Sequence, residues 1–191
     1  MKEPEMKIKG SHLSQLTGYK VLLAFTLLYF IAFGLLMVHT SGQPDQGPHA
    51  YFSRKFSETW RIPEDNPNIQ YLIKGQPYLY YWINGAVYKI LRFLLPSVNI
   101  VPGLLWRLIS LFYATLTVFF TYQLGKKVTG NPYYGILSAF FLSNTLMFVF
   151  VSGGISYDNL MNLAAIASIY HLVMVYKKED YVRHTAFVGF W

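Results

Sequence analysis

Long apolar runs separated by short polar turns dominate the chain. The first run covers residues 21–38, and further runs cover 104–124, 132–151 and 155–176. Each is close to the roughly 20 residues that an α-helix needs to cross the hydrocarbon core of a bilayer. The first run is too long for the apolar segment of a cleaved signal peptide, and no small-residue cleavage site follows it. The pattern predicts an all-α polytopic membrane protein with about four transmembrane helices.

A long polar and aromatic loop separates the first two runs. Within it, apolar residues recur at three- and four-residue spacing over residues 79–94, whereas Asn84, Lys89 and Arg92 fall on the opposite helical face. A helix with such a charged face is not suited to the hydrocarbon core, so we expect it to lie in the membrane interface. A shorter stretch over residues 50–60, with aromatic residues every four positions, is expected to do the same.

Composition agrees with a membrane protein. Hydrophobic residues make up 53% of the chain and charged residues only 13%, whereas soluble domains carry about 25% charged residues. The net charge of +7 is not concentrated in any stretch, so nucleic acid is not expected as a partner. The chain has no cysteine, which excludes disulfides, thiolate nucleophiles and cysteine-ligated metals. We expect a single membrane domain over residues 1–191.

The placement of lysine and arginine predicts the orientation. The N-terminal tail, the turn at residues 126–127 and the turn over 177–183 all carry positive charge, and they fall on one side if four helices alternate. By the positive-inside rule that side is cytoplasmic. The loop over residues 39–103 and the connection over 152–158 are then expected on the non-cytoplasmic face of a plasma or inner membrane, or of the endoplasmic reticulum in a eukaryote.

Three polar residues on the expected non-cytoplasmic face are candidates for chemistry. Asp45 lies just beyond the first predicted helix, where partial burial near lipid favours a general-base role; an ordinary loop or helix-cap aspartate is the alternative. His49 is a candidate for orienting that carboxylate or binding phosphate, or is a solvated loop histidine. Asp158 opens the fourth predicted helix, where aspartate is also a favoured N-terminal residue. No convincing metal site is formed, and a divalent cation requirement is left open.

Arg107 lies inside the second long apolar run, about one turn from its outer end. A charge at that depth is costly and tends to mark a functional residue. A guanidinium at headgroup depth also matches the geometry of a phosphate or pyrophosphate. The alternative is an arginine whose side chain extends to ordinary lipid headgroups.

In their order along the chain, these features resemble the N-terminal part of the GT-C membrane glycosyltransferases, the protein-O-mannosyltransferase and aminoarabinose-transferase-like enzymes. The resemblance extends from about residue 21 to residue 176. Four segments carry it: PDQGPHAYF, GQPYLYYWINGAVYKIL, WRLISLFYATLTVFFTYQLGKKVTG and SGGISYDNLMNL. The acidic pair that follows the first helix in that family reads Asp45-Gln46 here. The family's arginine that opens the next helix matches Arg107, and its aspartate after the third helix matches Asp158.

The resemblance implies transfer of a sugar from a polyprenyl-phosphate carrier to an acceptor on the non-cytoplasmic face, with inversion at the anomeric carbon. Asp45 would be the general base, and Arg107 would hold the carrier phosphate. The remaining implied substrate-binding residues are His49, Asp158, Tyr81 and Trp82. Membrane lipids are the other expected partners. Family members continue through further helices, so we expect this chain to be the N-terminal part of a longer enzyme.

Two other classes of protein are compatible with the sequence. One is a non-catalytic membrane subunit or degenerate relative that binds lipid or partner helices, and it is favoured by Gln46, which replaces the second acid of the pair. The other is a transporter fragment, in which Arg107 and Asp158 would serve as intramembrane charges.

Overall fold

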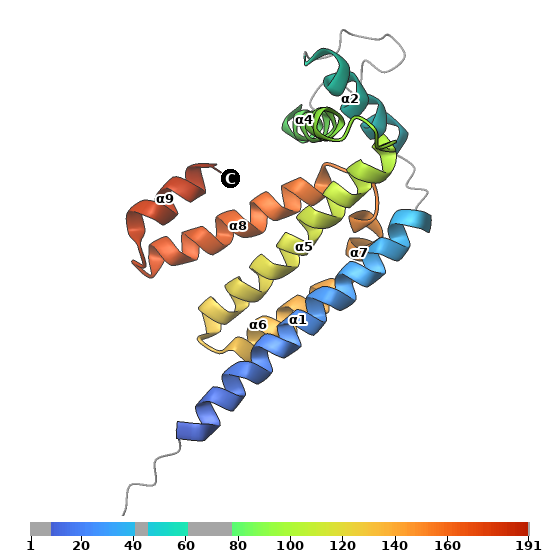
Figure 1. Ribbon diagram of the computed structural model, residues 1–191. Helices are drawn as coiled ribbons and strands as arrows, with labels where there is room; N and C mark the ends of the chain where they lie inside the picture. Colours follow the sequence, from blue (N-terminus) through green and yellow to red (C-terminus); the bar gives the residue numbers. More distant parts are fainter. Residues whose placement is uncertain (1–8, 41–45, 61–77, 191) are drawn as a thin grey trace, which may run out of the picture.

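The computed structural model describes residues 9–40, 46–60 and 78–190, and these residues form helices and connecting turns (Figure 1). The helices are α1 (Lys9–Thr40), α2 (Gln46–Thr59), α4 (Tyr78–Leu94), α5 (Pro102–Thr129), α6 (Pro132–Ser143), α7 (Leu146–Ser152), α8 (Asp158–Tyr176) and α9 (Tyr181–Phe190). No strand occurs among the described residues. The predicted all-α polytopic fold is confirmed.

Among the described residues, three helices are long and apolar enough to cross a membrane: the Gly18–His39 part of α1, α5 and α8. Their outward positions are apolar. On α5, for example, Leu104, Leu108 and Phe112 recur every four residues and remain exposed. Such a stripe is stable when the surrounding solvent is lipid. The protein is therefore an integral membrane protein, as the sequence predicted.

The third predicted span, residues 132–151, is not one straight helix. It consists of α6 and α7, which are bent by 71° at the short break between them. The Asn144 side-chain amide donates to the Phe140 carbonyl, and the Thr145 hydroxyl donates to the Phe141 carbonyl, so both side chains bond to the preceding turn. Short polar side chains that bond to the backbone in this way compete with the regular helix ladder. The apolar pattern alone did not reveal this break.

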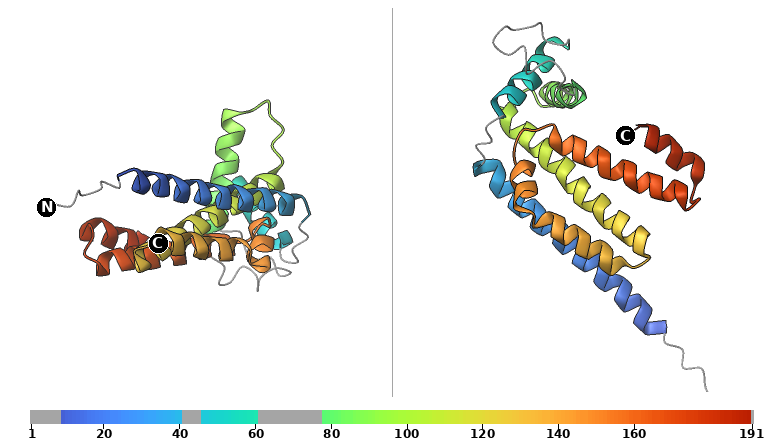
Figure 2. Two further views of the ribbon diagram at one scale, coloured as in Figure 1. Left: turned by 90° about the horizontal axis from the view of Figure 1, so that it is seen from below. Right: turned by 180° about the vertical axis from the view of Figure 1, so that it is seen from behind.

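α5 forms the centre of the bundle and packs against α1, α6 and α8 (Figures 1 and 2). Its side toward α1 and α6 belongs to a closely packed core. That core comprises Phe30, Val38, Leu111, Ala114, Val118, Tyr122, Ile136, Ala139 and Val149. The opposite side of α5 contacts α8 and, near its first turns, α2 and α4.

α2 and α4 lie across one end of the bundle. In Figure 1 α4 is seen end-on while α5 runs across the view, and in Figure 2 α4 projects sideways from the bundle. The helices predicted over residues 50–60 and 79–94 are therefore present. Their location in the membrane interface stays a prediction.

The face of α4 that is buried differs from the one expected. Asn84 was expected on the solvent-facing side, but it is fully buried together with Tyr80 and Tyr81. The apolar residues Leu79 and Ile90 are exposed instead. Of the residues assigned to the polar face, Lys89 and Arg92 are exposed as expected, whereas Asn84 is buried. In a membrane protein the apolar face can point to lipid while the polar and aromatic face packs inside.

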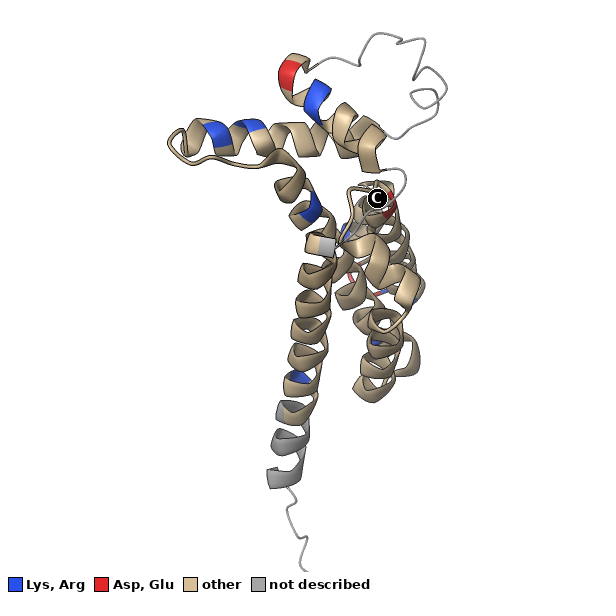
Figure 3. Cartoon of the chain, turned by 90° about the vertical axis from the view of Figure 1, so that its right-hand side faces the viewer, with Lys and Arg blue, Asp and Glu red and all other residues tan. Residues whose placement is uncertain are grey.

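Basic residues lie at both ends of the bundle: Figure 3 shows lysine and arginine on α2 and α4, and Lys126 and Lys127 lie in the last turn of α5 at the opposite end. Lys127 Nζ contacts the Glu179 carboxylate at 2.6 Å, and Lys177 donates to the Lys127 carbonyl. These contacts join the turn after α5 to the turn after α8. The orientation expected from the positive-inside rule stays a prediction.

The crossing of α2 over α4 depends on Gly85. A Cβ atom at this position would lie 2.8 Å from the Ser57 backbone nitrogen and 3.0 Å from the Phe56 carbonyl carbon. Because backbone atoms cannot move aside as a flexible side chain can, only glycine permits the two helices to approach this closely.

We therefore expect Gly85→Ala to destabilise the α2–α4 layer by roughly 1–3 kcal/mol, because the added methyl group overpacks the contact. Gly47→Ala is the matched control, because a Cβ atom there would meet no atom within 4 Å. Thermal denaturation of the detergent-solubilised protein should give a melting temperature several degrees lower for Gly85→Ala than for Gly47→Ala. Equal melting temperatures would show that the crossing is not tight.

Candidate functional site

The guanidinium of Arg107 lies where α5 begins and α1 ends. The side chain is half-buried and donates a hydrogen bond to the Val38 carbonyl, in the last turn of α1. Carbonyl groups at a helix C-terminus carry partial negative charge, so a cation there is favourable. Arg107, which is expected to contact a phosphate, therefore also has a partner within the protein. The sequence did not reveal this partner.

The loop over residues 153–157 connects this arginine to the layer formed by α2 and α4. It begins at Gly153, where a Cβ atom would lie only 2.9 Å from the Val38 nitrogen, so the loop starts beside the residue that accepts from Arg107. It ends at Tyr157, whose ring meets the His49 ring edge-on at a centroid distance of 5.2 Å. Residues 153–156 of this loop are buried, and the loop runs from one of these contacts to the other.

His49 lies on α2 and is buried against Tyr81 of α4, so it is not a solvated loop histidine. Its Nδ1 lies 2.7 Å from the Tyr81 hydroxyl oxygen, and the two rings stack at a centroid distance of 5.9 Å. Burial is the main factor that raises the pKa of Tyr81 above its ordinary value. The Tyr81 hydroxyl therefore stays neutral at physiological pH and holds the imidazole through a hydrogen bond rather than a charge.

Asp158 lies at the first turn of α8, as expected, and its side chain is exposed. The Ser156 hydroxyl donates to Asp158 Oδ2 at 2.9 Å, and the Asp158 backbone N–H donates to the Ser156 hydroxyl at 3.1 Å. These two contacts hold the carboxylate at the helix start, next to the loop that reaches His49.

Trp82 and Asp45 are the remaining two candidates. Trp82 is 47% exposed and meets the Phe56 ring edge-on at 6.1 Å, whereas Tyr81 stacks on the same ring from inside. Asp45, the expected general base, lies outside the described residues. In the sequence it directly precedes Gln46, the first residue of α2.

A buried polar network beside the candidate site was not anticipated from the sequence. The Tyr80 and Ser110 hydroxyl oxygens lie 3.0 Å apart, and the Asn84 amide donates to the Ser53 hydroxyl at 3.2 Å. All four side chains are fully buried. Burial raises the pKa of Tyr80 to about 12. The only signal in the sequence was the run of polar residues on one face of the 79–94 helix.

The described residues do not bring three or more histidine or acidic side chains together at a spacing that would hold a metal ion. The polar groups of the site are instead a guanidinium, an imidazole, a carboxylate and neutral hydroxyls. Together they suit the binding of phosphate and of sugar hydroxyls.

Comparison with models of known protein families, with curated proteins and with solved structures finds no match for this chain.

Proposed function

We propose that this chain forms the carrier-binding end of a membrane glycosyltransferase that takes a sugar from a polyprenyl phosphate on the non-cytoplasmic face. One observation carries the proposal: Arg107 and the His49–Tyr81 pair lie at the same end of a spanning bundle and are connected by the 153–157 loop. The resemblance to GT-C enzymes supplies the reaction.

The depth of Arg107 supports a lipid-borne substrate. It lies about one turn into a membrane-spanning helix, next to outward apolar residues such as Leu104 and Leu108. A phosphate attached to a polyprenyl chain would place its charge at that level while the chain stayed in lipid. The bond to Val38 sets the direction of the guanidinium before substrate binds, which reduces the cost of ordering it.

The proposed reaction is a single displacement at the anomeric carbon. The Asp45 carboxylate accepts the proton of the acceptor hydroxyl, and the acceptor oxygen forms a bond to the anomeric carbon. The bond between that carbon and the phosphate oxygen breaks, and the polyprenyl phosphate leaves with the electron pair. Arg107 stabilises the charge that develops on the leaving phosphate.

His49 and Asp158 are proposed to bind hydroxyl groups of the sugar or oxygens of the phosphate at the same end of the bundle. Tyr81 acts through His49 in this proposal: it is almost fully buried, and its hydroxyl faces the imidazole at 2.7 Å. Tyr81 is therefore a positioning residue rather than a direct contact to the substrate.

A non-catalytic membrane subunit is the second candidate. The bond from Arg107 to the Val38 carbonyl favours it, because that contact alone gives the arginine a structural role at the end of α1. The two candidates differ in what they expect of carrier binding and of sugar transfer, which the following two experiments measure separately.

Replacing Arg107 by glutamine is expected to weaken the binding of sugar-free polyprenyl phosphate about ten- to a hundredfold, because charge-assisted hydrogen bonds to the phosphate are lost. Binding can be measured on the nanodisc-embedded protein. Arg92→Gln is the matched control, since Arg92 lies in the exposed last turn of α4 and should leave binding unchanged. Equal binding by both variants would remove the phosphate role.

Replacing Asp45 by asparagine is expected to lower sugar transfer at least about a hundredfold, because the general base is lost. Transfer should be assayed with a panel of polyprenyl-phosphate sugars in membranes that contain the full-length protein. Binding of polyprenyl phosphate should remain within about twofold of the wild type. Transfer that persists in Asp45→Asn would show the base assignment to be wrong, and a wild-type protein that binds the carrier without transferring sugar would favour the subunit.

A further inference from the structure

A separate pocket of about 330 Å³ lies where α2 and α4 meet the first turns of α5. None of the residues assigned to the proposed reaction lines it. Its lining consists of Arg54, Ser57, Glu58, Tyr88, Pro102 and Trp106. We propose that this pocket binds the headgroup of a zwitterionic phospholipid, in which an ammonium is joined to a phosphate.

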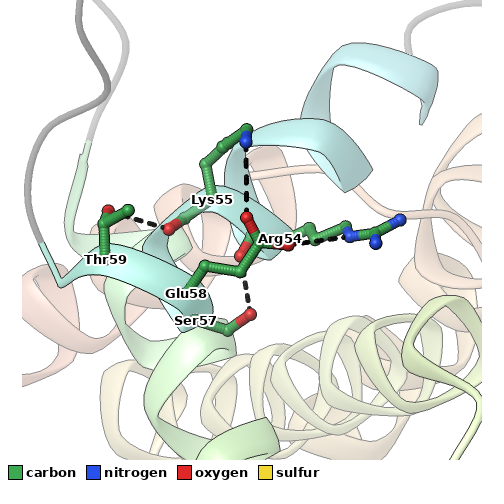
Figure 4. A network of polar contacts seen from close by, with 5 residues as sticks. All are labelled: Arg54, Lys55, Ser57, Glu58 and Thr59. Atoms are coloured by element: carbon green, nitrogen blue, oxygen red, sulfur yellow. Dashed lines mark hydrogen bonds and ion pairs between the residues drawn. The ribbon is translucent and has the colours of Figure 1, made fainter.

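The pocket presents charges of both signs. Figure 4 shows them on α2, where Arg54 Nε lies 3.0 Å from one Glu58 carboxylate oxygen and Lys55 Nζ lies 3.3 Å from the other. The hydrogen bond from Arg54, followed by that from Lys55, lowers the pKa of Glu58, so its carboxylate is ionised at neutral pH.

A ligand can replace the ion pair between Arg54 and Glu58 with little loss of protein stability. The side chains of Arg54 and Glu58 are 72% and 43% exposed, and ion pairs in such surroundings contribute little to stability. A phosphate on the guanidinium and an ammonium on the carboxylate would satisfy both groups. A net-anionic headgroup would leave the Glu58 carboxylate facing like charge, and a neutral sugar would satisfy neither charge fully.

Two aromatic side chains, Tyr88 and Trp106, also line the pocket. The rings of Tyr88 and Trp106 lie 6.3 Å apart and are inclined by 61°. Trp106 is held in place because its indole N–H donates to the Asn84 carbonyl. Aromatic faces attract ammonium groups, most strongly where water is partly excluded.

The surroundings of the pocket favour a lipid over a soluble phosphoammonium compound. Pro102 marks the start of the membrane-spanning α5, and the exposed stripe of Leu104, Leu108 and Phe112 begins immediately after it. Acyl chains attached to a headgroup in the pocket can lie along this stripe, and their contact with apolar side chains adds to binding.

Lipid retention by the purified full chain tests the proposal. The protein is reconstituted in nanodiscs with equal amounts of phosphatidylethanolamine and phosphatidylglycerol, and tightly held lipid is then measured by native mass spectrometry. We expect the wild type to retain phosphatidylethanolamine preferentially. Glu58→Gln and Arg54→Gln should each lower that retention about tenfold.

Lys55→Gln is the matched control, because Lys55 also contacts Glu58 but does not line the pocket. It should leave phosphatidylethanolamine retention within about twofold of the wild type. Circular dichroism checks that the surface substitutions leave the helices folded.

Three results would overturn the proposal: equal retention of the two lipids by the wild type, an equal loss in Lys55→Gln, or unchanged retention in both pocket variants. Binding of free phosphoethanolamine as tight as that of the lipid would overturn the assignment to a membrane lipid. Because neither polyprenyl phosphate nor sugar transfer enters this measurement, its failure would leave the proposed glycosyltransferase untouched.

Discussion

The lipid around the membrane-spanning helices constrains the whole structure. Moving an apolar helix face from lipid to protein brings no hydrophobic gain. The interior of the bundle is held by close packing and by hydrogen bonds between small or polar side chains. Buried positions accordingly include Ser53, Asn84, Ser110 and Asn159, whereas many leucine and phenylalanine side chains point outward. The same constraint explains why α4 buries Tyr80, Tyr81 and Asn84 and exposes Leu79 and Leu94.

That interior also positions the proposed site. Arg107 is held by the end of α1, His49 by Tyr81 on α4, and Asp158 by Ser156 at the start of α8. Arg107 and His49 take their direction from other helices and Asp158 from the loop before α8, so a disturbance of the α2–α4 layer should reach His49. The close approach at Gly85 therefore matters for function as well as for packing.

The layer formed by α2 and α4 carries two distinct chemistries. On the side of the 153–157 loop it holds an imidazole and buried hydroxyls, and beside the first turn of α5 an exposed ion pair and aromatic rings line one pocket. The first suits a phosphate-linked sugar and the second a zwitterionic headgroup. If both proposals hold, an ordinary lipid would anchor the layer against the bundle while the carrier binds on the other side.

Hydropathy and periodicity were sufficient to predict the membrane class, the spanning parts of α1, α5 and α8, and the helix over residues 79–94. These features depend on transferring one helix into lipid or its interface, and hydropathy and periodicity measure that directly. The tertiary structure alone decided the break after Ser143, the buried face of α4, and the partners of Arg107 and His49. Those partners lie 69 and 32 residues away in the chain, and contacts of that range depend on how helices pack, which no local pattern records.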